Sequence, residues 1–149
     1  MQTRYATALF LAGLFASAPV AAQISGTITD DNPTDSFVVA IPPLATPTDV
    51  VTPAGSTGEL GRRVAEIISN DLNATDVFTP KGPAGLRGTT MADITAPAFS
   101  EWAGMNAENL VHGYVRNNDD GTLTVGCYLY DVGLKSEMVR QGFVVQPRD

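Results

Sequence analysis

The feature that most constrains the fold is the last third of the chain, which is patterned as strands separated by short turns. Strands are expected over residues 110–115, 123–132 and 138–145. Between the first two, residues 117–121 have the sequence NNDDG, and an Asp-Gly pair is a strong signal for a hairpin turn. The sequence therefore predicts three consecutive antiparallel strands, a β-meander.

A helix is expected over residues 57–74. Thr57 is the predicted N-cap, and Glu59 lies early in the first turn, where a carboxylate suits the helix dipole. Apolar residues recur at the i, i+4, i+7 and i+8 spacing of a helix with one face in the core. This apolar stripe consists of Leu60, Val64, Ile67, Ile68 and Leu72.

A first strand is expected over residues 37–41, whose nearly continuous apolar run predicts burial on both faces. Pro42 and Pro43 end it, because proline cannot donate a hydrogen bond to a sheet. Residues 45–57 are rich in Thr, Pro and Gly, and we expect them to form an exposed loop.

The middle of the chain gives weaker signals. Val77 and Phe78 predict a brief return to the core. Residues 81–88 are Gly-rich, but they lack the preceding strand, the Lys-Ser/Thr pair and the following helix of a phosphate loop, so a flexible connection is expected. A short helix is expected over residues 97–105, with Phe99 and Trp102 on one side.

The order of these elements is strand, helix, short helix and three strands. It predicts an α+β domain in which helices pack on one side of a small mixed sheet. Two helices cover only part of a four-stranded sheet, so we expect that one helix of the domain is missing from this chain.

The first 22 residues have the layout of a secretory signal peptide. Arg4 is the only charge, an apolar stretch covers residues 6–18, and small residues precede Ala22, after which cleavage is expected. The alternative, an uncleaved membrane anchor, requires a longer apolar stretch. The organisation is therefore a signal peptide over residues 1–22, a flexible partner-binding segment over residues 23–35, and the α+β domain over residues 36–149.

The charge of the chain limits its partners. The formal net charge is −7, and it becomes −8 when Arg4 leaves with the signal peptide. An acidic exported chain has no electrostatic attraction to nucleic acid or anionic lipid, whereas a basic protein surface is favoured.

No group of residues points to catalysis. His112, the single histidine, lies in the middle of an expected strand, where a packed or surface residue is more common than a base. Cys127 is the single cysteine, so no internal disulfide can form; a small buried residue is expected, and no neighbour supports the alternative of a reactive thiol. No spacing fits zinc or calcium. We therefore expect no enzyme activity, no metal and no cofactor.

The expected first mature residues, 23–30, have the sequence QISGTITD. Ile24, Gly26 and Ile28 alternate with Ser25, Thr27 and Thr29, so an extended strand would carry two aliphatic side chains on one face and hydroxyls on the other. Such a strand can add to the exposed edge of a partner's sheet. The alternative is a frayed terminus without a role.

Taken in order, several stretches resemble the TolB amino-terminal domain family. They are VVAIPPL, GELGRRVAEIISNDLNATDVFTP and FSEWAGMNAENLVHGYVRNNDDGTLTVGCYLYDV, followed by a final strand. The resemblance covers residues 24–149. It implies a periplasmic, non-enzymatic component of the Tol–Pal system that supports outer-membrane integrity and cell division, without a nucleic acid or small-molecule substrate.

The resemblance also implies a partner and a site. In this family the first mature residues bind the C-terminal domain of TolA. By position, the binding residues here are Ile24, Ser25, Gly26, Thr27, Ile28, Thr29 and Asp30. Family members continue into a further helix and a six-bladed β-propeller that carries most of the contact with Pal, so contact with Pal is not expected for this chain.

Two other functions stay open at this point. One is a small periplasmic ligand-binding or adaptor domain unrelated to Tol, which predicts an apolar pocket between helix and sheet. The other is a hydrolase with an unusual site around His112.

Overall fold

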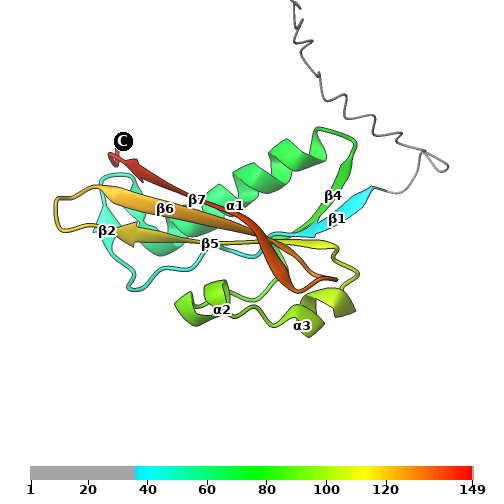
Figure 1. Cartoon of the computed structure of the whole chain (residues 1–149). Helices are drawn as coiled ribbons and strands as arrows, with labels where there is room; N and C mark the ends of the chain where they lie inside the picture. Colours follow the sequence, from blue (N-terminus) through cyan, green and yellow to red (C-terminus); the bar gives the residue numbers. More distant parts are fainter. Residues whose placement is uncertain (1–35, 149) are drawn as a thin grey trace, which may run out of the picture. The chain divides into compact units, whose positions relative to one another are not determined.

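The computed structural model describes residues 36–148, and its centre is a five-stranded mixed sheet in the order β4-β1-β5-β6-β7 (Figure 1). Strand β1 is parallel to both of its neighbours, β4 and β5, whereas β6 is antiparallel to both of its neighbours, β5 and β7. This is the predicted α+β class with a small mixed sheet. The strands are β1 (Phe37–Ala40), β4 (Phe78–Lys81), β5 (Asn109–Asn117), β6 (Leu123–Asp131) and β7 (Ser136–Val145).

The predicted meander is confirmed. Strands β5 and β6 pair without interruption from Asn109 opposite Asp131 to Asn117 opposite Leu123. The turn between them holds Gly121 at φ 81°, a conformation that glycine adopts without steric cost. The register of β6 with β7 shifts between Leu129 and Tyr130.

The long helix α1 (Thr57–Asn73) matches the predicted span, but its N-cap is Ser56 and not Thr57. The Ser56 hydroxyl accepts a hydrogen bond from the Glu59 amide, as an N-cap does. Thr57 is fully buried, and its hydroxyl contacts Thr46 and the carbonyl of Thr48. It therefore fixes the preceding loop to the start of the helix.

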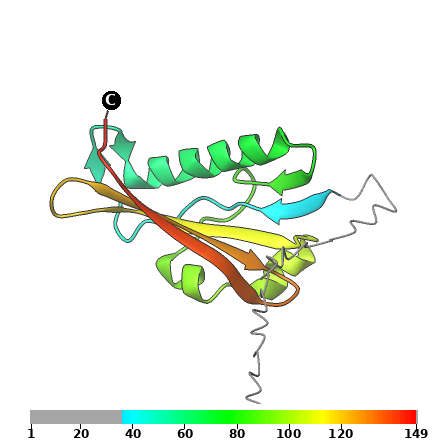
Figure 2. The ribbon, with the colours of Figure 1, turned by 45° about the horizontal axis from the view of Figure 1, so that its top comes forward.

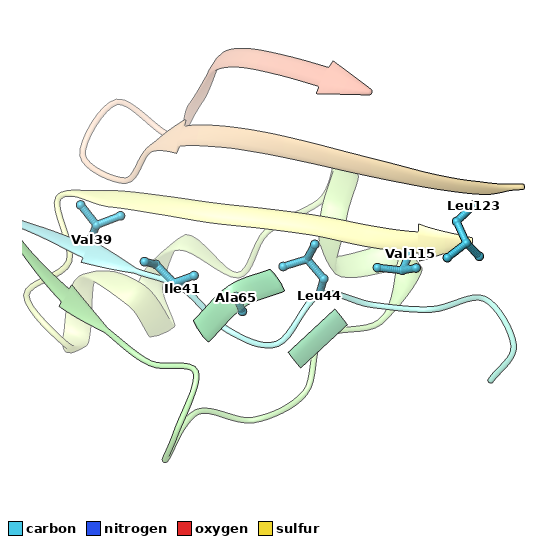
Figure 3. Packing of buried hydrophobic residues seen from close by; sticks show 6 residues of the cluster. All are labelled: Val39, Ile41, Leu44, Ala65, Val115 and Leu123. Carbon is cyan, nitrogen blue, oxygen red and sulfur yellow. The ribbon is translucent and has the colours of Figure 1, made fainter. Parts of the chain in front are cut away.

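Helix α1 packs on one face of the sheet. Figure 3 shows Ala65 of α1 facing Val39 and Ile41 of the β1 segment, together with Leu44, Val115 and Leu123. The helix approaches closely because position 61 is glycine: a Cβ there would lie 2.5 Å from the carbonyl oxygen of Leu44.

Two short helices, α2 (Met91–Thr95) and α3 (Phe99–Gly104), lie across the sheet from α1 (Figure 2). Their core is built on fully buried Trp102, packed with Ala40, Leu110 and Tyr130. The sequence predicted helices on one side of the sheet. Helix α1 covers that side, and the short helices α2 and α3 cover the opposite face. The reason is the alternation of β1, which sends Val39 to the α1 core and Ala40 to the other.

Three features differ from the sequence predictions. The brief return at Val77 and Phe78 is a full strand, β4, which includes Pro80 because β4 is a sheet edge. Helix α2 follows the expected flexible connection and begins with a capping box of Thr90 and Asp93. The expected exposed loop contains buried Ala45, bonded to β5, and a small hairpin of β2 (Val51–Thr52) and β3 (Gly55–Ser56).

All ten residues of the edge strand β7 are exposed. Its apolar side chains therefore contribute little to the core of the part that the structure describes. This agrees with the thin cover expected from sequence, and the missing helix stays a prediction. Within residues 36–148, no helix is long and apolar enough to cross a membrane.

Candidate interaction site

The predicted binding residues, Ile24 to Asp30, and the predicted signal peptide lie outside the described residues. The structure instead shows where the chain enters the domain. The Phe37 amide donates to the carbonyl of Val77, and the Ser36 hydroxyl is hydrogen-bonded to that of Thr79. The entry point is thus fixed to the edge strand β4 at the beginning of β1.

An open groove of about 720 Å³ lies at this end of the sheet, where β1, β5 and β7 begin and β6 ends. We call it the sheet-end groove. Its lining includes Phe37, Glu108, Asn109, Asp131, Val132 and Met138.

The walls of the sheet-end groove are fixed by backbone hydrogen bonds. The Glu108 amide donates to Val38, and the Glu108 carbonyl accepts from Val132. The Asp131 carboxylate accepts from the Leu134 amide at 2.7 Å, which orders the turn before β7. These hydrogen bonds therefore hold the loops that line the groove to the ends of the strands.

The sequence did not single out these groove residues. Phe37, Glu108, Asp131 and Met138 come from four separate segments that only strand pairing brings together. The single local signal is that Phe37 and Met138 are large apolar residues at the ends of expected strands.

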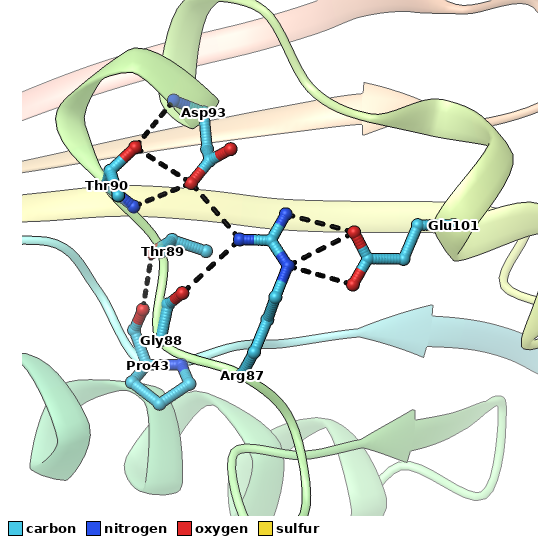
Figure 4. A network of polar contacts seen from close by, with 7 residues as sticks. All are labelled: Pro43, Arg87, Gly88, Thr89, Thr90, Asp93 and Glu101. Carbon is cyan, nitrogen blue, oxygen red and sulfur yellow. Dashed lines mark hydrogen bonds and ion pairs between the residues drawn. The ribbon is translucent and has the colours of Figure 1, made fainter.

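A cluster of charged and polar side chains joins the two short helices, α2 and α3 (Figure 4). The Arg87 guanidinium donates to Glu101 at 2.9 Å and to Asp93 at 3.3 Å. Hydrogen bonds from Thr90, followed by Arg87, lower the pKa of Asp93 to about 2, and Arg87 lowers the pKa of Glu101. Each charge is paired, so this network ties α2 to α3 rather than offering a free group for a ligand.

His112 is packed, as the sequence favoured. It is 1% exposed, neither ring nitrogen has a hydrogen-bond partner, and its ring lies edge-on to Trp102 at 5.8 Å and to Tyr130 at 6.3 Å. Burial lowers its pKa to about 4, so the ring is neutral at pH 7. A buried ring without an orienting partner does not support a hydrolase site.

Cys127 is half-buried on the α1 face of β6, and burial raises the pKa of its thiol. It therefore has little thiolate at neutral pH. Among residues 36–148, no group of three His, Cys, Asp or Glu side chains could hold a metal ion.

The adaptor alternative predicted an apolar pocket between helix and sheet. At the centre of that interface, Ala65 is fully buried and Gly61 lies against the backbone of Leu44. This contact leaves no space for a ligand between α1 and the strands at that point.

Comparison with known proteins shows the family. The family model of the TolB amino-terminal domain matches residues 28–138, which is more than half of the chain. Tol-Pal system protein TolB of Rhizorhabdus wittichii is 45% identical over 147 residues, covering 99% of this chain and 33% of the relative. The corresponding protein of Zymomonas mobilis is 44% identical over 127 residues, covering 85% of this chain and 27% of the relative. The chain thus spans about a third of the length of these relatives.

Solved structures agree in fold. The crystal structure of TolB from Acinetobacter baumannii aligns with a TM-score of 0.54 at 21% identity, over 76% of this chain and 24% of that one. The C-terminal domain of LpoB from Salmonella enterica aligns with a TM-score of 0.50 at 13% identity, over 78% and 87%. The fold alone is therefore shared with a protein of another name, whereas the sequence match is to TolB. This chain belongs to the TolB amino-terminal domain family.

Proposed function

We propose that this protein is a non-enzymatic, periplasmic component of the Tol–Pal system that binds the C-terminal domain of TolA through residues 24–30. The observation that carries the proposal is the family match over residues 28–138, together with relatives named as Tol-Pal system proteins. Its role would be to support outer-membrane integrity and cell division through protein–protein contact.

The mechanism follows from the chemistry of the segment. In an extended strand, Ile24 and Ile28 lie on one face and Ser25, Thr27 and Thr29 on the other. Main-chain hydrogen bonds to an exposed sheet edge would supply affinity, and pockets for the two isoleucines would supply specificity. The folded domain would present this strand from a fixed point, because the Phe37 amide donates a hydrogen bond to the carbonyl of Val77, directly before β4.

Two sets of groups that could otherwise act on a ligand are occupied within the domain. Arg87, Asp93 and Glu101 are committed to one another, and His112 is buried without partners. The described domain thus serves as a scaffold in this proposal.

A matched pair of double variants tests the proposal by calorimetric titration against the TolA C-terminal domain. Ile24→Asp with Ile28→Asp should abolish binding, because each aspartate places a charge in an apolar pocket. Thr27→Asp with Thr29→Asp adds the same charge to the polar face and should weaken binding less than tenfold. Equal affinities for both double variants would contradict the proposed anchors.

A further inference from the structure

The proposed TolA-binding segment is followed closely in the sequence by Phe37, a residue that lines the sheet-end groove. Six residues, 31–36, separate Asp30 from Phe37, which lines the groove. The seven Cα–Cα steps from Asp30 to Phe37 span at most about 25 Å when extended. Any partner that holds Asp30 therefore has its surface within about 25 Å of Phe37.

The groove offers apolar contact surface. The side chains of Phe37 and Met138 are 52% and 57% exposed on its rim, while Ala107 and Val132 are buried beneath it. Phe37 is supported from behind by Phe78, at 6.3 Å between ring centroids, so its position is fixed. Large exposed apolar side chains around a groove are typical of a protein-binding surface.

The groove also carries two carboxylates without a cationic partner. Neither Glu108 nor Asp131 forms an ion pair within residues 36–148, where the ion pairs join Arg87 to Asp93 and Glu101, and Arg140 to Glu137. The nearby Lys81 amine is bonded to the carbonyl of Met105 and does not line the groove. The local charge is therefore negative, in agreement with the net charge of −7.

From this geometry we propose that the sheet-end groove is a second docking surface for the partner of the N-terminal segment, taking a short stretch with a Lys or Arg beside an apolar side chain. The inference rests on the proposed function for the partner's identity. The cation would lie between Glu108 and Asp131, and the apolar side chain would pack between Phe37 and Met138. A second copy of this acidic chain is disfavoured as the occupant, because it would bring like charge to the groove.

The test separates the groove from the N-terminal segment with two probes. The first is a capped tetrapeptide, Leu-Lys-Phe-Lys, titrated into the isotope-labelled exported chain and followed by amide chemical shifts. A neutral tetrapeptide, Leu-Gln-Phe-Gln, is its control. The second probe is the TolA C-terminal domain, titrated with and without residues 23–30.

The variant Glu108→Gln with Asp131→Asn removes both charges, and the new asparagine side chain keeps an oxygen that accepts from the Leu134 amide. The matched control, Glu66→Gln with Asp71→Asn, removes two charges from α1. We expect the basic tetrapeptide to shift the amides around the groove, and the groove variant to weaken that binding at least threefold. The groove variant should weaken TolA binding three- to tenfold and reduce its salt dependence, while the control variant changes neither.

Each outcome decides one proposal. Amide chemical-shift changes elsewhere on the domain, or changes that the groove variant leaves intact, would contradict the proposal that the sheet-end groove is a docking surface. Chemical-shift changes around the groove with the basic tetrapeptide, but no binding of TolA, would support the groove as a docking surface and contradict the proposed function. Groove shifts that coincide with concentration-dependent dimerisation of the chain alone would assign the groove to a second copy and overturn the proposed occupant.

Discussion

The two faces of the sheet are covered by different means. On one face, a single 17-residue helix packs through an aliphatic stripe, and two small residues, Gly61 against Leu44 and Ala65 in the core, let it approach closely. On the other, two helices of five and six residues pack through Ile94 of α2 and Trp102 of α3 and are joined by Arg87. The first face depends on a helix that its own sequence specifies, whereas the second depends on contacts between distant segments.

The sharpest test of this comparison is Trp102, which is fully buried in the core of α2 and α3. Trp102→Ala should lower the free energy of unfolding by about 3–5 kcal/mol, because it removes the largest buried side chain of that face. Trp102→Phe should cost only about 1–2 kcal/mol, since the indole N–H has no hydrogen-bond partner to lose. Urea unfolding followed by circular dichroism measures both. A small effect of Trp102→Ala would show that α2 and α3 contribute little to stability.

The matching test on the α1 face is Gly61→Ala. Alanine raises helix propensity by about 1 kcal/mol, yet its Cβ would lie 2.5 Å from a backbone oxygen. We expect a net loss of about 1–3 kcal/mol in the free energy of unfolding. Gly104→Ala in α3 is the control, because a Cβ there meets nothing within 4 Å. Equal effects of the two substitutions would contradict the close packing of α1.

The face covered by α2 and α3 should also respond to pH. Burial lowers the pKa of His112 from 6.5 to about 4, so its neutral form stabilises the fold above pH 6.5, and this contribution is lost as the pH falls towards 4. Between pH 7 and 5 we expect a loss of about 1–2 kcal/mol in the free energy of unfolding. Asp93, with a pKa of about 2, loses its contribution only at lower pH.

The variant His112→Leu isolates the histidine, because leucine has a similar volume and does not titrate. Its free energy of unfolding, measured by urea titration, should change less between pH 7 and 5 than that of the unaltered chain. An unchanged pH dependence would assign the effect to other groups.

The smallest expected effect is that of Arg87→Met. Its ion pairs with Asp93 and Glu101 are partly exposed, so their loss should cost about 0.5–1 kcal/mol. The difference from the unaltered chain should shrink at high salt, where exposed ion pairs are screened. A difference that is independent of salt in urea unfolding would indicate that the Arg87 side chain acts through packing.

The elements that the sequence predicted well are those with local patterns, and the elements that it predicted poorly depend on contacts between distant segments. The meander and helix α1 carry local patterns, a hairpin turn and an apolar stripe, and both were predicted almost to their ends. Strand β4 contains Pro80, and its pairing with β1 is a parallel contact between distant segments, so the local pattern indicated only a brief return to the core and not a strand. Helix α2 has five residues, too few for a periodic pattern to appear.

The candidate site was predictable in the same uneven way. Alternation in residues 24–30 suggests a strand, but its partner came from the family resemblance and stays a prediction. The sheet-end groove could not be predicted, because Glu108 and Asp131 become neighbours only when β5 pairs with β6.

The most direct test is a titration of residues 23–149, the chain without its predicted signal peptide, against the TolA C-terminal domain, with and without residues 23–30. Circular dichroism would first confirm that both forms are folded. We predict that residues 23–149 bind and that removing residues 23–30 reduces binding by at least tenfold. Equal binding by both forms, or no binding by the folded complete form, would contradict this prediction.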